Sequence, residues 1–247
     1  MNGYYESPSL LGQYLLLHYG RHDEVLGWPD GPAAGLDFPG RCAARLGRAL
    51  EGRRCARFLD LGCAVGRSTF EALRWADEAV GLDYSAAFIA AAVELSQAGR
   101  LPFPRLDEGL MTTALVAEVP PDLPRERARF VQGDACSPAP GLGKFGAVLL
   151  ANLLCRLPDP GRCLRALPSL VEAGGVVMIT TPCSWMEAFT PQDRWLGGVD
   201  APTLDGIRRE MEPAFQLLQT EEMPFLIREH ARKFQWSVAQ ASFWRRG

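Results

Sequence analysis

Short apolar runs alternate along this chain with longer amphipathic stretches. The runs that predict buried strands are 57–61, 79–83, 129–132, 147–151 and 176–180. Stretches with helical periodicity lie among them, at 68–75, 86–97 and 160–171. This alternation is typical of a parallel sheet covered by helices on both faces.

The two ends of the chain depart from this alternation. Residues 215–221 and 234–244 are both strand-like with no long helix between them, which predicts a final antiparallel pair. The proline-bearing segment 27–40 predicts a loop, and the proline-rich segment 101–124 predicts an insertion. We therefore expect an α/β fold: a doubly wound, mostly parallel seven-stranded sheet with an antiparallel last strand. Its expected division is an N-terminal helical cap and loop, 1–40, and a main domain, 41–247.

Composition narrows the class of protein. The chain has 247 residues, 47% of them hydrophobic, which suffices for one core, and its net charge of −3 lacks the basic footprint of a nucleic-acid binder. Its seven cysteines form no Cys-x-x-Cys pair, and its three histidines lack metal-ligand spacing, so we expect free thiols and no metal. The N-terminus shows no secretory pattern and no apolar run that could span a bilayer. These features predict a cytoplasmic protein that binds neither membranes nor nucleic acid.

A glycine-bearing turn follows the first predicted strand. Residues 59–66 read LDLGCAVG, in which Gly62 and Gly66 allow close backbone approach, and a helix beginning near Arg67 would offer free N–H groups to a negative group. A dinucleotide-binding turn, G-x-G-x-x-G, needs a glycine where Arg67 stands. The pattern instead resembles the D-x-G-x-G-x-G turn of methyltransferases, which holds the aminoacyl end of S-adenosylmethionine, with Ala64 replacing the middle glycine. The alternative is a tight strand-to-helix turn without a ligand.

Acidic residues end the next two predicted strands. Asp83 ends the second strand, where an acid can accept hydrogen bonds from both ribose hydroxyls, and Asp134 follows the third, where methyltransferases accept from the adenine amino group. Each acid could instead cap a helix. Acids at three successive strand ends favour a cofactor site of the class I, Rossmann-like methyltransferase fold. The predicted contacts to S-adenosyl-L-methionine are Asp60, Gly62, Cys63, Ala64, Gly66, Asp83, Tyr84, Asp134, Ala135 and Asn152.

Several segments point to a narrower family. They are YYES (4–7), QYLLLHYG (13–20), DLGCAVGRS (60–68), GDAC (133–136), ANLLCRLPDP (151–160) and PFLIREHARKFQW (224–236). Together they resemble the 4-mercaptohistidine N1-methyltransferase family of ovothiol biosynthesis over nearly the whole chain, least in 99–127. The resemblance implies methyl transfer from S-adenosylmethionine to an imidazole nitrogen of 5-thiohistidine, giving ovothiol A. That activity is often the C-terminal domain of a larger sulfoxide synthase; here it would stand alone, linked functionally to a separate synthase.

The implied reaction sets requirements on the site. An unprotonated imidazole nitrogen already has a lone pair, so alignment and exclusion of water matter more than a strong base. Orientation must also select among two ring nitrogens and a thiolate. The predicted catalytic residues are Asn152, His230 and Tyr19. The predicted substrate-binding residues are Tyr5, Tyr14, Arg156, Trp185, Trp195, Arg228 and Lys233, since arginine binds a carboxylate bidentately and aromatic rings could close over an imidazole.

Other interpretations stay open. Tyr14 and Tyr19 could face the core, His230 could lie on the surface, and Arg156 could pair with Asp159. The protein could methylate another small metabolite, or bind S-adenosylmethionine without turnover as a partner of a synthase. A nucleotide-binding oxidoreductase is disfavoured by the turn spacing.

Overall fold

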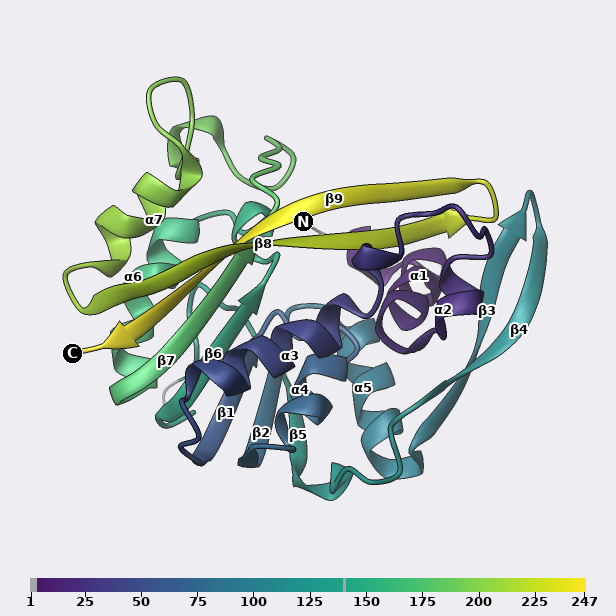
Figure 1. Ribbon diagram of the computed structural model, residues 1–247, viewed down its shortest axis with the longest axis horizontal. Helices are drawn as coiled ribbons and strands as arrows, with labels where there is room; N and C mark the ends of the chain where they lie inside the picture. Colours follow the sequence, from purple (N-terminus) through teal and green to yellow (C-terminus); the bar gives the residue numbers. More distant parts are fainter. Residues whose placement is uncertain (1–3, 140) are drawn as a thin grey trace.

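A mixed sheet forms the centre of the computed structural model, which describes residues 4–139 and 141–247 (Figure 1). In this part of the chain it has seven strands in the order β5-β2-β1-β6-β7-β9-β8, and the first five run parallel. β9 runs antiparallel to both β7 and β8. The predicted doubly wound sheet with an antiparallel last strand is therefore confirmed. The strands are β1 (Cys55–Leu61), β2 (Ala76–Asp83), β5 (Ala128–Gln132), β6 (Phe145–Ala151), β7 (Val171–Thr181), β8 (Phe215–His230) and β9 (Lys233–Arg246).

Helices cover both faces of the sheet because the inner strands are apolar on both sides. Phe58 faces one layer and packs with Leu46, whereas the adjacent Leu59 faces the other and packs with Leu164. The first layer holds α3 (Phe38–Ala49), α4 (Arg67–Ala72) and α5 (Ala86–Ala98), and the second holds α6 (Pro160–Leu170) and α7 (Thr203–Met211). Short 3₁₀ turns are η1 (Tyr4–Glu6), η2 (Ala33–Gly35), η3 (Arg125–Arg127), η4 (Leu154–Arg156) and η5 (Gln192–Arg194).

Three separate pieces of chain form a cap beside the carboxyl ends of the parallel strands. They are the N-terminal helices α1 (Pro8–Tyr19) and α2 (His22–Val25), an inserted hairpin of β3 (Arg100–Glu108) and β4 (Met111–Glu118), and the outer half of the β8–β9 hairpin (Figure 1). α1 packs against both β3 and β8, and the shared apolar cluster includes Leu16, Phe103 and Leu226. The predicted insertion at 101–124 thus becomes part of the cap. The predicted loop at 27–40 is wrong at its end, since α3 begins at Phe38.

A buried ion pair ties the pieces of the cap together. Arg228 is 6% exposed, and its guanidinium donates to Asp107 on β3 at 2.9 Å and to the carbonyl of Glu24 on α2 at 3.1 Å. Arg105 binds the same two partners, at 2.9 Å and 3.0 Å. The sequence placed Arg228 in a substrate-binding loop; the structure places it within β8, where it holds the cap.

The role of Arg228 as a tether makes a stability prediction. Arg228→Ala should lower the free energy of unfolding by about 2 kcal/mol, because it removes a buried charged donor from Asp107 and from the Glu24 and Val25 carbonyls, although Asp107 and the Glu24 carbonyl keep their bonds to Arg105. Lys233→Ala is the control: Lys233 is exposed and pairs with Glu229 at 2.8 Å, so its loss should cost less than about 0.5 kcal/mol. Urea unfolding measures both. Unchanged stability of Arg228→Ala together with a raised KM for substrate would restore the substrate-binding role.

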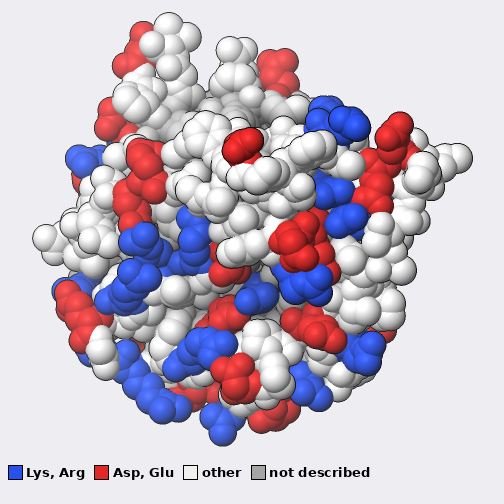
Figure 2. Space-filling model, turned by 45° about the vertical axis from the view of Figure 1, so that its right-hand side comes forward, with Lys and Arg blue, Asp and Glu red and all other residues white. Residues whose placement is uncertain are grey.

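The surface of the molecule carries mixed charge. On the face shown in Figure 2, Lys and Arg side chains alternate with those of Asp and Glu. This face therefore has no broad basic surface of the kind that binds a nucleic-acid backbone. Among the described residues, no helix is long and apolar enough to cross a membrane, and no group of three or more His, Cys, Asp or Glu side chains could hold a metal ion.

Candidate active site

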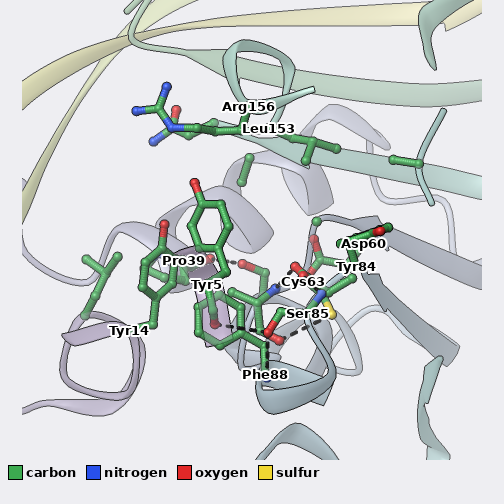
Figure 3. A pocket seen from close by; sticks show the side chains of 18 of the residues that line it. Tyr5, Tyr14, Pro39, Asp60, Cys63, Tyr84, Ser85, Phe88, Leu153 and Arg156 are labelled. Atoms are coloured by element: carbon green, nitrogen blue, oxygen red, sulfur yellow. Dashed lines mark hydrogen bonds between the residues drawn. The ribbon is translucent and has the colours of Figure 1, made fainter. Parts of the chain in front are cut away.

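A cavity of about 680 Å³ lies at the carboxyl ends of β1, β2 and β6 (Figure 3). Two pieces of the cap, α1 and the outer half of the β8–β9 hairpin, also line it. Its walls hold both predicted cofactor contacts and predicted substrate contacts. The cofactor contacts that line it are Asp60, Gly62, Cys63, Ala64, Asp83, Tyr84, Asp134, Ala135 and Asn152. The substrate contacts that line it are Tyr5, Tyr14 and Arg156. The predicted site residues that do not line the cavity are Gly66, Tyr19, Trp185, Trp195, Arg228, His230 and Lys233.

The turn after β1 owes its course to left-handed backbone. Gly62 and Gly66 have φ of 78° and 84°. A Cβ on Gly62 would lie 2.8 Å from the Leu153 side chain, and a Cβ on Gly66 would lie 2.6 Å from the Phe130 ring. Ala64 also has a positive φ, of 46°, which explains why a glycine commonly stands there in this type of turn. Gly66 is the N-cap residue that precedes α4, and it is not among the residues that line the cavity.

Two acids, the buried Asp60 and the partly buried Asp83, dominate the electrostatics of the wall formed by the ends of β1 and β2. Asp60 is 1% exposed and accepts from the Thr69 hydroxyl at 2.8 Å; burial raises the pKa of Asp60 to about 7. Asp83 accepts from the backbone N–H groups of Ala64 and Ser85, both at 2.9 Å, and burial raises its pKa as well. The cap of α5 is Ser85, whose side chain accepts from Phe88 N–H. Asp83 is therefore not that cap, and its carboxylate faces the cavity.

The N-terminal segment closes one side of the cavity, next to Asp83. The Glu6 carboxylate accepts from Ala86 and Ala87 N–H, both at 3.1 Å, and the Ser85 hydroxyl donates to the Tyr5 carbonyl at 3.2 Å. These bonds hold η1 against the start of α5. The Tyr5 and Tyr14 rings consequently pack on Phe88, with centroid distances of 5.9 Å and 4.8 Å.

Arg156 and Asn152, which both follow β6, form another wall of the cavity. The Arg156 guanidinium lies over the Phe189 ring, 5.0 Å from its centroid, and donates to the Ser184 carbonyl at 3.1 Å. Figure 3 shows Arg156 across the cavity from Cys63 and Phe88, with the Tyr5 ring extending toward it. Asn152 has a φ of 53°, and its side-chain oxygen accepts from the Thr180 hydroxyl at 2.9 Å. That bond directs the amide oxygen toward β7.

Two predicted catalytic residues do not reach the cavity. Tyr19 is buried, and its hydroxyl donates to the Val65 carbonyl at 2.8 Å, so it supports the glycine-bearing turn from behind. His230 ends β8, and its Nδ1 accepts from Arg232 N–H at 3.3 Å in the hairpin turn. The predicted placement of both residues at the site is therefore corrected.

Three predicted substrate contacts also lie away from the cavity wall. The indoles of Trp185 and Trp195 stack on each other with centroids 6.5 Å apart, and they donate to Thr203 Oγ1 and the Thr190 carbonyl. They brace the loop between β7 and α7. Lys233 begins β9 and is held at the surface by its ion pair with Glu229. The loop that the sequence predicted around Lys233 is a tight hairpin, which explains this placement.

The cavity contains polar residues that the sequence did not single out, among them His18, Gln132, Ser184, Gln235 and Ser237. Most come from the cap, whose approach to the sheet no local pattern reveals. One sequence expectation is also corrected here. The N–H of Arg67, expected to be free for an anion, donates to His18 Nδ1 at 3.4 Å.

The fold and the site together define a class of protein. This strand order, with acids at the ends of three strands around one cavity, is that of the class I S-adenosylmethionine-dependent methyltransferases. The wall fits that cofactor, because Gly62 leaves room for close approach and the buried Asp60 and the partly buried Asp83 offer acceptors. The model of the family described as "Methyltransferase domain" matches residues 36–231, so the chain belongs to this family.

Solved structures support the fold. The N-methyltransferase NodS from Bradyrhizobium japonicum WM9, in complex with S-adenosylhomocysteine, has a TM-score of 0.54 at 14% identity over 96% of this chain and 98% of its own. The [4+2]-cyclase SpnF has a TM-score of 0.60 at 16% identity, over 96% and 93% of the two chains. The YcgJ protein from Bacillus subtilis has a TM-score of 0.55 at 14% identity, over 83% and 97%. No curated protein matches the chain in sequence.

Proposed function

We propose that this methyltransferase transfers a methyl group from S-adenosylmethionine to an imidazole nitrogen of 5-thiohistidine, giving ovothiol A. The observation that carries the proposal is the division of the cavity. In Figure 3 Asp60 lies on one side of the cavity, whereas the Tyr5 and Tyr14 rings lie on the other side, below the Arg156 guanidinium. A small aromatic ring bearing a carboxylate fits that second half. The resemblance of the six sequence segments to the ovothiol family supports the same substrate.

The residues of the chain would act by position. The cofactor, when bound, supplies the methyl group. The perpendicular Tyr5 and Tyr14 rings would contact the imidazole by a face and an edge, and Arg156 would bind the substrate carboxylate. The imidazole nitrogen would form its bond to the methyl carbon as the carbon–sulfur bond breaks, so the positive charge would pass from sulfur to the imidazole ring, and the ring would lose its proton to water once the product leaves the cavity. The cap would exclude water from the reacting atoms, and alignment would supply most of the rate enhancement.

The test is a product assay. Purified protein is mixed with S-adenosylmethionine and 5-thiohistidine, with histidine as the control, and the products are identified by mass spectrometry, with NMR to place the methyl group. N-methylated thiohistidine with little product from histidine would support the proposal. S-methylation would keep the substrate and replace the methylated atom, whereas turnover of another metabolite only would replace the substrate. Cofactor binding without any methylated product would favour a non-catalytic partner of a synthase.

Arg156 gives the proposal a residue-level prediction. Arg156→Ala should raise the KM for thiohistidine by about 10-fold to 100-fold, the value of one charge-assisted interaction, and leave the affinity for S-adenosylhomocysteine unchanged. Arg194→Ala is the control, because Arg194 is half exposed and pairs with Asp159 outside the cavity wall. Steady-state kinetics and calorimetry measure the two quantities. An equal loss of substrate and cofactor affinity would mean that Arg156 only braces the wall through Ser184.

A further inference from the structure

His18 has a buried imidazole that takes no part in the proposed methyl transfer. It lies near the end of α1, is 8% exposed, and lines the cavity. Tyr14, one helical turn earlier, shares its face, so α1 presents both side chains to the site. A polar group this buried ordinarily has partners for both of its ring nitrogens.

Only one ring nitrogen has a partner within the protein. Nδ1 accepts from Arg67 N–H at 3.4 Å, which places the ring proton on Nε2. Among the described residues, nothing accepts a hydrogen bond from Nε2, and Nε2 is not among the four buried side-chain polar atoms that lack a partner. Nε2 is therefore solvent-accessible, and His18 lines the cavity, so Nε2 faces it. His18 thus offers a single hydrogen-bond donor to whatever occupies the cavity.

The imidazole is a neutral donor. Burial, together with the nearby Arg67 guanidinium, lowers the pKa of His18 to about 3. The ring consequently stays uncharged at neutral pH and keeps its Nδ1 lone pair for Arg67 N–H.

The neighbours of His18 show which end of the cavity it serves. His18 contacts Arg67, and Asp60 contacts Thr69, two residues further along α4, so both lie beside the same short helix. Asp83 and Asp134 follow β2 and β5, which lie beyond β1 in the strand order β5-β2-β1. One end of the cavity therefore combines a buried acid with a neutral N–H donor. A zwitterionic amino-acid head, with its ammonium and its carboxylate, matches that pair.

We propose that His18 Nε2–H binds the carboxylate of the aminoacyl group of S-adenosylmethionine, while Asp60 receives its ammonium. The inference rests on the cofactor and not on the identity of the methyl acceptor. His18 would select donors and products that keep the amino-acid head over nucleosides that lack it.

Calorimetric titration with two ligands tests this role. S-adenosylhomocysteine carries the aminoacyl group, and 5′-methylthioadenosine lacks it. His18→Phe should lower the affinity for S-adenosylhomocysteine by about 10-fold or more and leave that for 5′-methylthioadenosine unchanged. His18→Gln, which can return an N–H near the position of Nε2, should recover most of the loss.

The outcomes separate binding from packing. Equal losses for the two ligands would mean that His18 only supports the wall, and no loss for either would remove it from the site; both results overturn the proposal. If His18→Phe does not fold, the same comparison is made with His18→Ala, which also lacks the N–H donor, and Tyr19→Phe, which changes α1 behind the cavity wall, is its control. The titrations contain no thiohistidine, so the result stands whichever methyl acceptor is found.

Discussion

Replacing Asp83 by alanine is expected to lower the affinity for S-adenosylhomocysteine by at least about 100-fold. The carboxylate ends β2 at the cavity and would accept hydrogen bonds from both hydroxyls of a ribose. Hydrogen bonds to a charged group contribute about 1.5–3 kcal/mol each, and about 1.4 kcal/mol corresponds to a factor of ten. Two such bonds therefore account for the expected loss. Few single side chains of the site carry as much.

Isothermal titration calorimetry measures this effect, and a residue on the same strand provides the control. Asp77→Ala removes an acid of β2 that is 45% exposed and pairs with Arg54, so it should leave the affinity unchanged. Asp83 also accepts from Ala64 N–H, so circular dichroism must show that the variant stays folded. A folded Asp83→Ala variant with native affinity would contradict the assignment of this acid to the ribose.

The cofactor half of the site could be predicted because it depends on local pattern. Buried parallel strands are continuous apolar runs, and their carboxyl ends meet at one edge of the sheet. Asp60, Asp83 and Asp134 each follow such a run, and the structure brings all three to one cavity. The left-handed turn after β1 is likewise visible in the sequence as Gly62 and Gly66.

The substrate half could not be predicted to the same degree, because it is built by long-range packing. β8 and β9 have 16 and 14 residues and extend beyond the sheet into the cap, so a charged segment that looks like a loop is paired strand. Arg228 becomes buried only because β3 and α2 meet there. On α1, the face toward the cavity depends on how the helix docks, which distinguishes His18 from the adjacent Tyr19.

Asp60 and His18 should oppose each other in the dependence of stability on pH. The pKa of Asp60 is raised from 3.8 to about 7 on folding, so the unfolded chain loses this proton first and the folded state loses stability as the pH rises from 4 to 7. The pKa of His18 is lowered from 6.5 to about 3, so the unfolded chain gains its proton first and the folded state gains stability as the pH rises from 3 to 6.5. Since one pKa unit corresponds to about 1.36 kcal/mol, the two contributions have upper limits of about 4 and about 5 kcal/mol.

Single substitutions should reveal the two opposing dependences of folding stability on pH. Without ligand, Asp60→Asn should be stabilised relative to the native protein at pH 7, and its stability should rise between pH 4.5 and 6.5, because the His18 contribution is no longer opposed by that of Asp60 and only in part by that of Asp83. His18→Phe should show the reverse slope, to which the raised pKa of Asp83 adds with the same sign. Urea unfolding at both pH values measures the difference, with exposed Asp77→Asn as the control. Parallel stability curves for all four proteins would contradict the burial of these two charges. If the two contributions nearly cancel in the native protein, the cavity can hold a buried carboxyl group and a buried imidazole for one ligand while the stability of the empty fold depends little on pH.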